Sequence, residues 1–452
     1  MSRGQDRLTA ALLALLAAGL VMVLSGWQAE YVAFREFDNL YFHADIALVY
    51  ANMTDFTSNH YRTGMHPGFS LLAAYTVRGL ESVGLSPFAA VQATLAVNAA
   101  AQTAILYILI RRASLALIPA VRFTLLFLSS ATLFFWHSVA ETFAFGGTTL
   151  LIVLLIASAK APGTGLLIFG NVVAMSMTMT NWMAAFYTTV WHRWGRWKSV
   201  FGIFVAAGVL IVLIGILSKL VFPSAGVAGD FRRYLAWVRL PQSGDWPAFF
   251  GHSMVMPAPD YHITANGSLA AMVEPSTLAS GSVVGPVALG LWFLLLVAGA
   301  VGLWRARRQA LATVLGLTAL SQLGLHSFFS DGPFLFAAHF GPLLVLVAAH
   351  AMLLPRAGKI ILPALAVCVL LTAVNNITVY QALDARLTAE LLPWLQANGT
   401  PHERFCVVSD VDRAGGFRTA AHRAHKVVIG DISDIRRSKR RGVGPWPWHR
   451  HL

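Results

Sequence analysis

Charged residues are scarce in this chain. Lys, Arg, Asp and Glu make up 12% of its 452 residues, and hydrophobic residues make up 57%. Soluble globular domains carry about 25% charged and roughly 45–50% apolar residues, so the composition excludes a soluble enzyme and indicates a membrane protein. Cysteine is also scarce, because only Cys368 and Cys406 occur. They allow at most one disulfide bond and lack metal-ligand spacing, which argues against redox chemistry.

Acidic residues are outnumbered by basic residues, 20 against 33, which gives a formal net charge of +13. Most Lys and Arg residues lie in short clusters at the ends of apolar runs, where they act as topology signals. The positive charge therefore does not indicate binding to nucleic acid. The sequence also shows no internal repeat and no low-complexity block.

Long apolar runs predict the membrane helices. A helix needs about 20 residues to cross roughly 30 Å of hydrocarbon. We predict an all-α polytopic membrane protein with about 11 transmembrane helices and an external first loop that contains interfacial helices. The predicted crossings are 8–27, 88–110, 118–136, 143–158, 165–178, 182–191, 201–222, 283–304, 311–329, 334–354 and 360–379.

The basic clusters give the predicted orientation, because cytoplasmic loops are enriched in Lys and Arg. Arg3 and Arg7 precede the first run, which we interpret as an uncleaved signal anchor with a cytoplasmic N-terminus. The predicted crossings then place the internal clusters at 111–112 and 305–308 on the cytoplasmic side. The partly apolar segment 66–84 is not counted as a crossing, because it carries Arg78 and Glu81. A charge at the bilayer centre costs about 2.5–3.5 kcal/mol. We predict that this segment is re-entrant or interfacial.

The chain divides into a membrane domain and a polar tail. We predict a transmembrane domain over 1–379, with external loops at 28–87 and 223–282, and an extracytoplasmic C-terminal tail over 380–452. The basic run at 436–441 conflicts with an external tail, although charges far from a span influence topology little. The tail is expected to be disordered or to bind anionic headgroups. Ala- and Leu-rich spans without eukaryotic retention signals favour a bacterial inner (plasma) membrane.

The first external loop is dense in acids, histidines and aromatic residues. Amphipathic aromatic side chains suit a site at the lipid headgroup level. The alternative is an interfacial helix with ordinary solvated charges. The candidate site residues of this loop are Asp38, Tyr41, Asp45, His60, Arg62 and His66.

Further candidates lie at other external ends of the predicted spans. Glu141 stands at the outer entrance to a span, where a carboxylate is expensive unless it meets water, a partner or a substrate; otherwise it is a simple span-end residue. Asp331 lies in a later external loop, and His339 follows within an apolar helix, where a packing role is equally plausible. Asn181 is more simply interpreted as a helix cap than as a ligand.

These loops offer carboxylates, imidazoles and an arginine to one face of the membrane. A carboxylate that activates a hydroxyl, together with cations that stabilise a departing phosphate, would suffice for group transfer from a phosphorylated lipid. Arg62, His60 and His66 are candidate phosphate contacts, because charged donors make the strongest hydrogen bonds to phosphate oxygens.

The order of these parts resembles the GT-C superfamily of membrane glycosyltransferases, which includes protein O-mannosyltransferases and the aminoarabinose transferases of lipid A. Those families carry an acid in the first external loop, then a His-Pro or Lys-Pro pair that opens a short apolar helix, then a second acid. The matching pieces are Asp38-Asn39-Leu40-Tyr41 or Ala44-Asp45, then His66-Pro67, then Glu141. The resemblance covers about the first 200 residues. The chain has Asn39 where the family often pairs two acids, and it lacks the family's large C-terminal domain.

The resemblance implies inverting transfer of a sugar from a polyprenyl-phosphate donor to a lipid, glycan or protein acceptor at the extracytoplasmic face. Asp45 or Asp38 would be the general base, Arg62 and His66 would hold the lipid phosphate, and Glu141 would orient acceptor or sugar. The sequence shows no metal-ligand cluster, although some members of the family use a divalent cation and these acids could bind one.

The main competing interpretation is a transporter or flippase for a lipid-linked or polar substrate. In it, Glu141, Asp331 and His339 would be relay or substrate groups within the membrane. Transporters tend to place such groups near the bilayer midplane and often contain repeats. Acids clustered at one outer site favour the enzyme, and acids strung through the bilayer favour the transporter.

Overall fold

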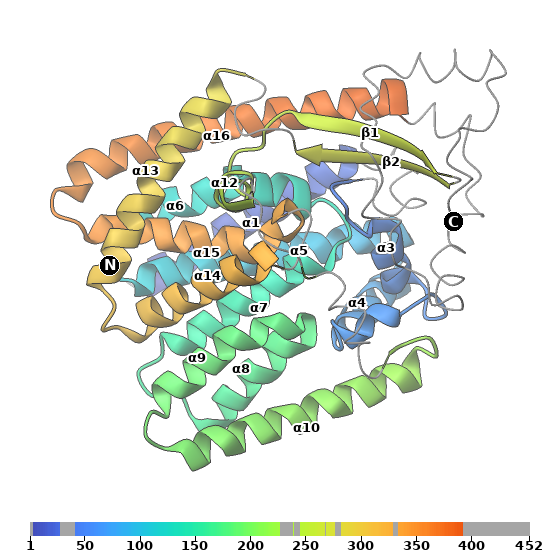
Figure 1. Ribbon diagram of the computed structural model, residues 1–452, viewed down its shortest axis with the longest axis horizontal. Coiled ribbons are helices and arrows are strands. Elements are labelled where there is room, and N and C mark those ends of the chain that lie inside the picture. Colours follow the sequence, from blue (N-terminus) through green and yellow to red (C-terminus); the bar gives the residue numbers. More distant parts are fainter. Residues whose placement is uncertain are drawn as a thin grey trace.

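A computed structural model describes residues 3–27, 41–226, 238, 245–266, 268–275, 282–328 and 333–391 (Figure 1). Seven helical segments are long and apolar enough to cross a membrane. The chain is therefore a largely helical, polytopic integral membrane protein. These segments are α1 (Arg3–Trp27), α5 (Pro87–Arg112), α10 (Trp197–Val221), α13 (Val284–Arg305), α14 (Ala310–Phe328), Phe334–Leu353 with α15 (Ala337–Ala349), and α16 (Ala357–Arg386).

Four shorter helices complete the set of apolar helices that the sequence predicts. They are α6 (Leu117–Ser129), α7 (Thr142–Ala157), α8 (Thr164–Met177) and α9 (Trp182–His192). Each of the predicted apolar runs coincides with one helical segment except 118–136. This run divides into α6 and a π-helical turn, η3 (Thr132–Trp136), because Ser130 between them is extended. At a rise of 1.5 Å per residue, a helix of about 16 residues spans about 24 Å, less than the roughly 30 Å of hydrocarbon. The number of full crossings therefore stays a prediction.

The two loops that the sequence predicts to be external contain short elements. The first loop forms α3 (Ile46–Thr54), the 3₁₀ turn η2 (Tyr61–Gly64) and α4 (Phe69–Ser82). With 14 residues, α4 is not among the helices able to cross a membrane. The second loop forms α12 (Asp245–Gly251) and an antiparallel hairpin, which the sequence analysis did not anticipate. The hairpin pairs β1 (Pro259–Asn266) with β2 (Ser268–Pro275).

Close helix packing depends on glycine. Gly146 and Gly147 lie on α7, at the centre of the bundle in Figure 1. A Cβ on Gly147 would stand 2.2 Å from the carbonyl oxygen of Ala338, and a Cβ on Gly146 would stand 2.1 Å from Nε2 of His339. Small residues let membrane helices approach closely. The glycine pair thus allows α15 to lie against α7 and brings His339 toward the site.

Hydrogen bonds join the first loop to the bundle. The amide of Gly68, before α4, donates to the carbonyl of Ser176 on α8 at 2.7 Å. The hydroxyl of Ser218 on α10 donates to the carbonyl of Pro67 at 2.7 Å. The loop that carries the predicted acids and histidines is therefore held against helices far along the sequence.

One polar contact bears on orientation. Asp6, near the start of α1, lies 2.8 Å from Nε of Arg111 at the end of α5, and it accepts a hydrogen bond from Tyr107 at 2.9 Å. The start of α1 and the end of α5 lie at the same end of the bundle, as the predicted topology requires.

Candidate functional site

Glu141 forms the N-terminal cap of α7. One carboxylate oxygen, Oε1, accepts from the amide of Thr142 at 2.7 Å and from its hydroxyl at 2.8 Å. An acid at a helix N-terminus satisfies amide groups that have no partner inside the helix, and it also complements the helix dipole. Glu141 is only 1% exposed, so its oxygens serve the protein rather than solvent.

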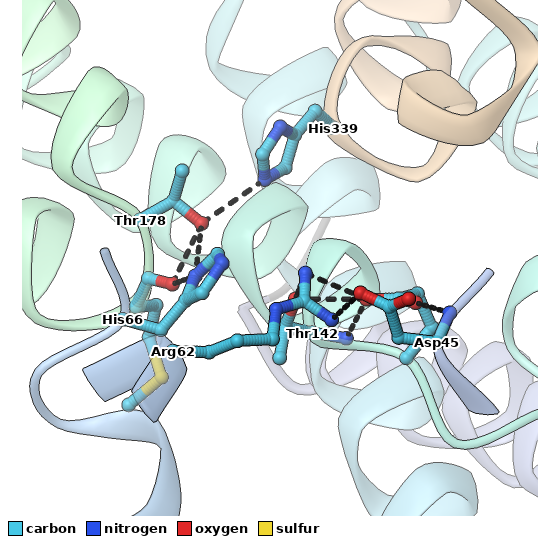
Figure 2. Close-up of polar contacts among 8 residues, drawn as sticks. Asp45, Arg62, His66, Thr142, Thr178 and His339 are labelled. Atoms are coloured by element: carbon cyan, nitrogen blue, oxygen red, sulfur yellow. Dashed lines mark hydrogen bonds and ion pairs between the residues drawn. The ribbon is translucent and has the colours of Figure 1, made fainter. Parts of the chain in front are cut away.

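Arg62, on η2, brings two acids together (Figure 2). Its Nη1 lies 2.9 Å from Oδ2 of Asp45, and its Nη2 lies 3.7 Å from Oε1 of Glu141. The amide of Asp45 donates to the second Glu141 oxygen at 3.3 Å. We call Asp45, Arg62 and Glu141 the acid–arginine cluster. Its members come from the first loop and from the start of α7, which α4, α5 and α6 separate along the chain.

Exposure distinguishes the two acids of the cluster. The side chain of Asp45 is 29% exposed, against 1% for Glu141 and 13% for Arg62. Burial raises the pKa of Glu141, and the charge of Asp45 adds to this effect, whereas Arg62 and the Thr142 hydrogen bonds oppose it. Asp45 is therefore the carboxylate that a substrate can reach.

A strained turn precedes Asp45. The amide of Ala44 donates to the carbonyl of Tyr41 at 2.9 Å, and the two residues between them, Phe42 and His43, have φ angles of 51° and 63°. Such a turn normally uses Asn and Gly, because the left-handed conformation costs other residues about 1–2 kcal/mol each. Strain of this kind tends to occur at functional sites. Here the turn leads directly into Asp45.

The aromatic side chain of Phe42 helps to hold this turn. It is 1% exposed and packs edge-on against Phe135 at 5.8 Å and Phe334 at 5.1 Å between ring centroids. Burying a large aromatic side chain contributes about 1.5–3 kcal/mol, which offsets the cost of the turn.

Two histidines meet at Thr178, just beyond α8 (Figure 2). Nδ1 of His66 lies 2.5 Å from the carbonyl oxygen of Met177 and 3.3 Å from the hydroxyl of Thr178, which is also 3.3 Å from Nε2 of His339. Burial, with a contribution from the charge of Arg62, lowers the pKa of His66 to about 3. His66 is therefore neutral near pH 7. Its single N–H, on Nδ1, donates to the carbonyl of Met177, so Nε2 is an acceptor and the ring offers a phosphate neither a charge nor a hydrogen-bond donor.

Phe143 lies between these histidines and the acid–arginine cluster. The guanidinium carbon of Arg62 is 5.8 Å from the centroid of the Phe143 ring. The same ring is 5.0 Å from the His339 ring and 6.0 Å from the His66 ring. The structure thus brings five of the predicted residues, Asp45, Arg62, Glu141, His66 and His339, to the beginning of α7.

His60 and Tyr41 lie in packing positions. Nδ1 of His60 is 3.0 Å from the Ser70 hydroxyl, and its ring stacks on Phe222 at 4.1 Å. These contacts connect the first loop to the end of α10. Tyr41 is 1% exposed, and its ring centroid is 6.2 Å from that of Trp136. These contacts of His60 and Tyr41 do not involve Asp45, Arg62 or Glu141.

Asn181 occupies the position before α9, but its side chain makes no capping bond. The interpretation of Asn181 as a helix cap is therefore confirmed for its position, whereas its side chain takes no part in capping. Its amide instead donates to the carbonyl of Gly146 at 2.9 Å and to the hydroxyl of Thr149 at 3.1 Å, because the apex turns back onto α7. The predicted site residues Asp38 and Asp331 lie outside the described residues.

Sequence reasoning missed Thr142 and Thr178, which make the polar contacts around Glu141 and between the histidines. The Glu141-Thr142 pair at the start of an apolar run was a detectable signal, because acids and hydroxyl residues favour helix N-termini. Thr178 lies at the end of an apolar run beside the polar apex 179–181, but nothing in one sequence shows that His66 and His339 approach it.

A divalent cation does not fit the side chains in view. Among the described residues, no group of three or more His, Cys, Asp or Glu side chains is arranged to hold a metal ion. Asp45 and Glu141 both face the guanidinium of Arg62, which competes for the oxygens that a cation would need.

Comparison of the chain with protein-family models, curated proteins and solved structures found no significant match. The resemblance to GT-C glycosyltransferases rests on short sequence motifs alone. Function is therefore argued from the chemistry of the site.

Proposed function

We propose that the protein is a membrane glycosyltransferase that moves a sugar from a polyprenyl-phosphate donor to an acceptor on the extracytoplasmic face. The acid–arginine cluster carries the proposal, because it sets a partly exposed carboxylate 2.9 Å from a guanidinium. Sugar transfer from a lipid phosphate needs a base for the acceptor hydroxyl and a cation for the departing phosphate.

Asp45 and Arg62 divide these roles. The acceptor oxygen attacks the anomeric carbon as the bond from this carbon to the phosphate oxygen breaks, and the hydroxyl proton passes to Asp45. The lipid phosphate leaves with the bonding electrons, and Arg62 stabilises its charge. Arginine suits this role, because its planar donors match phosphate oxygens. A single displacement inverts the configuration of the sugar.

Glu141 supports both residues without facing the substrate. Its buried oxygens accept from the amide of Asp45 and from Thr142, and its charge lies 3.7 Å from Arg62. The sequence analysis assigned it to the orientation of acceptor or sugar. Its contacts favour a positioning role through Asp45 and Arg62.

The distribution of acids favours the enzyme over the transporter. Within the seven segments able to cross a membrane, all of them described, the acids are Asp6 near the start of α1 and Asp384 near the end of α16. No carboxylate lies near the middle of these segments. The two acids of the cluster instead meet at one end of α7, as expected for a catalytic site at one face.

The test is transfer of radiolabelled sugar from a panel of polyprenyl-phosphate sugars to membrane extracts by purified protein. Asp45→Asn should abolish transfer while the protein stays folded. Asp55→Asn is the matched control, because Asp55 is an exposed first-loop acid that bonds locally to Thr57. Asp38→Asn tests the remaining candidate base.

Retention of transfer by Asp45→Asn, with loss in Asp38→Asn, would assign the base to Asp38. Absence of transfer with every donor, together with substrate flux into proteoliposomes, would replace the enzyme by a transporter.

A further inference from the structure

Cationic side chains gather at the end of α7 opposite to the acid–arginine cluster. The cluster surrounds the first residue of α7, Thr142. The last residue of this helix, Ala157, lies about 22 Å from Thr142 at the rise of an α-helix. At that far end, Nη1 of Arg112, on α5, donates to the carbonyl of Leu155 at 3.1 Å and to the hydroxyl of Ser158 at 2.7 Å.

A third segment joins the same place. Nε2 of His192, at the end of α9, lies 3.1 Å from the carbonyl oxygen of Ala157, and Nη2 of Arg193 donates to the carbonyl of Pro162 at 2.9 Å. Segments 112–116, 158–163 and 192–198 therefore meet, and their sequences contain no Asp or Glu. We call the surface formed by their cations the cationic face; it consists of Arg112, Lys160, Arg193, Arg196 and Lys198.

Two tryptophans stand beside these cations. Trp194 is 73% exposed and Trp197 is 55% exposed, with their ring centroids 5.5 Å apart. A turn places them there, because Gly195 has a φ of +76° and the amide of Arg196 donates to the carbonyl of Arg193 at 2.8 Å. Exposed indoles are typical of the headgroup level of a membrane.

Exposed apolar side chains continue from the cationic face along two neighbouring helices. Leu166 and Phe169, on the first turns of α8, are 43% and 50% exposed. Phe201 and Val205, on the first turns of α10, are 71% and 48% exposed. Figure 1 shows α8 and α10 side by side, and their residues are in contact. A small dissolved anion would not contact these apolar side chains, whereas a phospholipid would place its acyl chains on them.

We propose that the cationic face binds the headgroup of an anionic phospholipid whose acyl chains lie along the exposed sides of α8 and α10. Each Lys or Arg close to an anionic lipid surface strengthens the attraction about fivefold. Three loops that are joined by hydrogen bonds hold several such charges in one place. The inference is independent of the glycosyltransferase activity.

The experiment compares lipid retention by full-length protein released from nanodiscs that contain equal parts of phosphatidylcholine and phosphatidylglycerol. Native mass spectrometry counts the lipids that stay bound. The site variant Lys160→Gln/Arg196→Gln/Lys198→Gln changes exposed side chains, so it is expected to fold normally, as thermal unfolding would verify. Wild type should retain phosphatidylglycerol over phosphatidylcholine, and the site variant should lower this preference at least about tenfold.

A matched control removes three charges from another basic loop. Arg305, Arg307 and Arg308 are also exposed, and their replacement by Gln should leave the preference within about twofold of wild type. An equal loss in the control would overturn the proposal, because any basic loop would then suffice. The proposal would also be overturned if wild type showed no preference for phosphatidylglycerol. Displacement of the lipid by soluble glycerol phosphate would overturn it too, because the cationic face would then bind free anions.

Discussion

Replacement of Glu141 by Gln tests whether this acid positions the site. One Glu141 oxygen accepts from the amide and hydroxyl of Thr142, and the other accepts from the amide of Asp45. Gln keeps one oxygen but presents an NH₂ group in place of the other. If the Gln oxygen stays on Thr142, the NH₂ group of Gln faces the amide of Asp45, and both groups are donors. Glu141 is only 1% exposed, so water cannot easily serve as the missing acceptor.

The expected loss of stability follows from these contacts. A hydrogen bond to a charged group contributes about 1.5–3 kcal/mol, and an unpaired buried donor costs about 1–3 kcal/mol. Arg62 keeps its 2.9 Å ion pair with Asp45, so the variant avoids the cost of about 3–5 kcal/mol for an isolated buried charge. We expect Glu141→Gln to lower the free energy of unfolding by about 2–4 kcal/mol.

Asp45→Asn should show the opposite pattern. Its carboxylate is 29% exposed, and pairs at partly exposed positions contribute about 0–1 kcal/mol. We therefore expect nearly normal stability and no sugar transfer, whereas Glu141→Gln should be clearly destabilised and retain part of the activity. Denaturant unfolding of the purified proteins in detergent, beside the transfer assay, measures both quantities.

The control Asp55→Asn should match wild type in both assays. A larger loss of stability in Asp45→Asn than in Glu141→Gln would refute the reasoning, since Asp45 would then be the structural acid of the pair.

Three further changes test other parts of the structure. The folded state holds the pKa of His66 near 3 instead of 6.5, so the unfolded state binds more protons between these pH values. The free energy of unfolding should therefore fall as pH drops from 6.5 to 3, and His66→Asn should make its dependence on pH less steep in this range. Gly146→Ala should destabilise by about 1–3 kcal/mol through the clash with His339, whereas Gly290→Ala, with nothing within 4 Å of a new Cβ, should not. His43→Asn should raise the unfolding temperature by relieving about 1 kcal/mol of backbone strain.

The helices were predictable because the membrane leaves the backbone few options. Each long apolar run must satisfy its own amide and carbonyl groups, which only a helix does within one segment. The hairpin was missed for the opposite reason. It lies in a polar loop where no lipid restricts the backbone, although the dipeptide at 266–267, Asn-Gly, is a known turn signal.

The members of the site were easier to predict than their arrangement. Glu141 stood out because a carboxylate at the entrance to a span is costly without a partner. Asp45 and Arg62 stood out because the first loop is dense in acids, histidines and aromatic residues. Which acid lies closer to solvent depends on the cap of α7 and on the turn at Phe42 and His43. The Glu141-Thr142 pair signals the cap, whereas no residue pattern encodes the turn. Sequence therefore placed both acids in the site but assigned Glu141 a contact with substrate that its burial does not favour.

Charge within the acid–arginine cluster leads to a final prediction. Two carboxylates and one guanidinium sum to a formal charge of −1, which opposes the approach of an anionic lipid phosphate. A proton on Glu141 would make the cluster neutral, and burial already raises the pKa of that acid. If the protein uses a polyprenyl-phosphate donor, its KM for this donor should fall as pH falls, because donor binding and protonation of Glu141 favour each other.

Glu141→Gln should remove this pH dependence and keep a low KM, while kcat falls because Asp45 and Arg62 lose their support. Asp55→Asn should keep the wild-type profile, since Asp55 lies outside the cluster. A KM that is independent of pH in wild type would show that the phosphate does not sense the charge of Glu141. Arg62 would then have to bind the donor at a distance from the buried acid, and the phosphate would lie on the Asp45 side of the guanidinium.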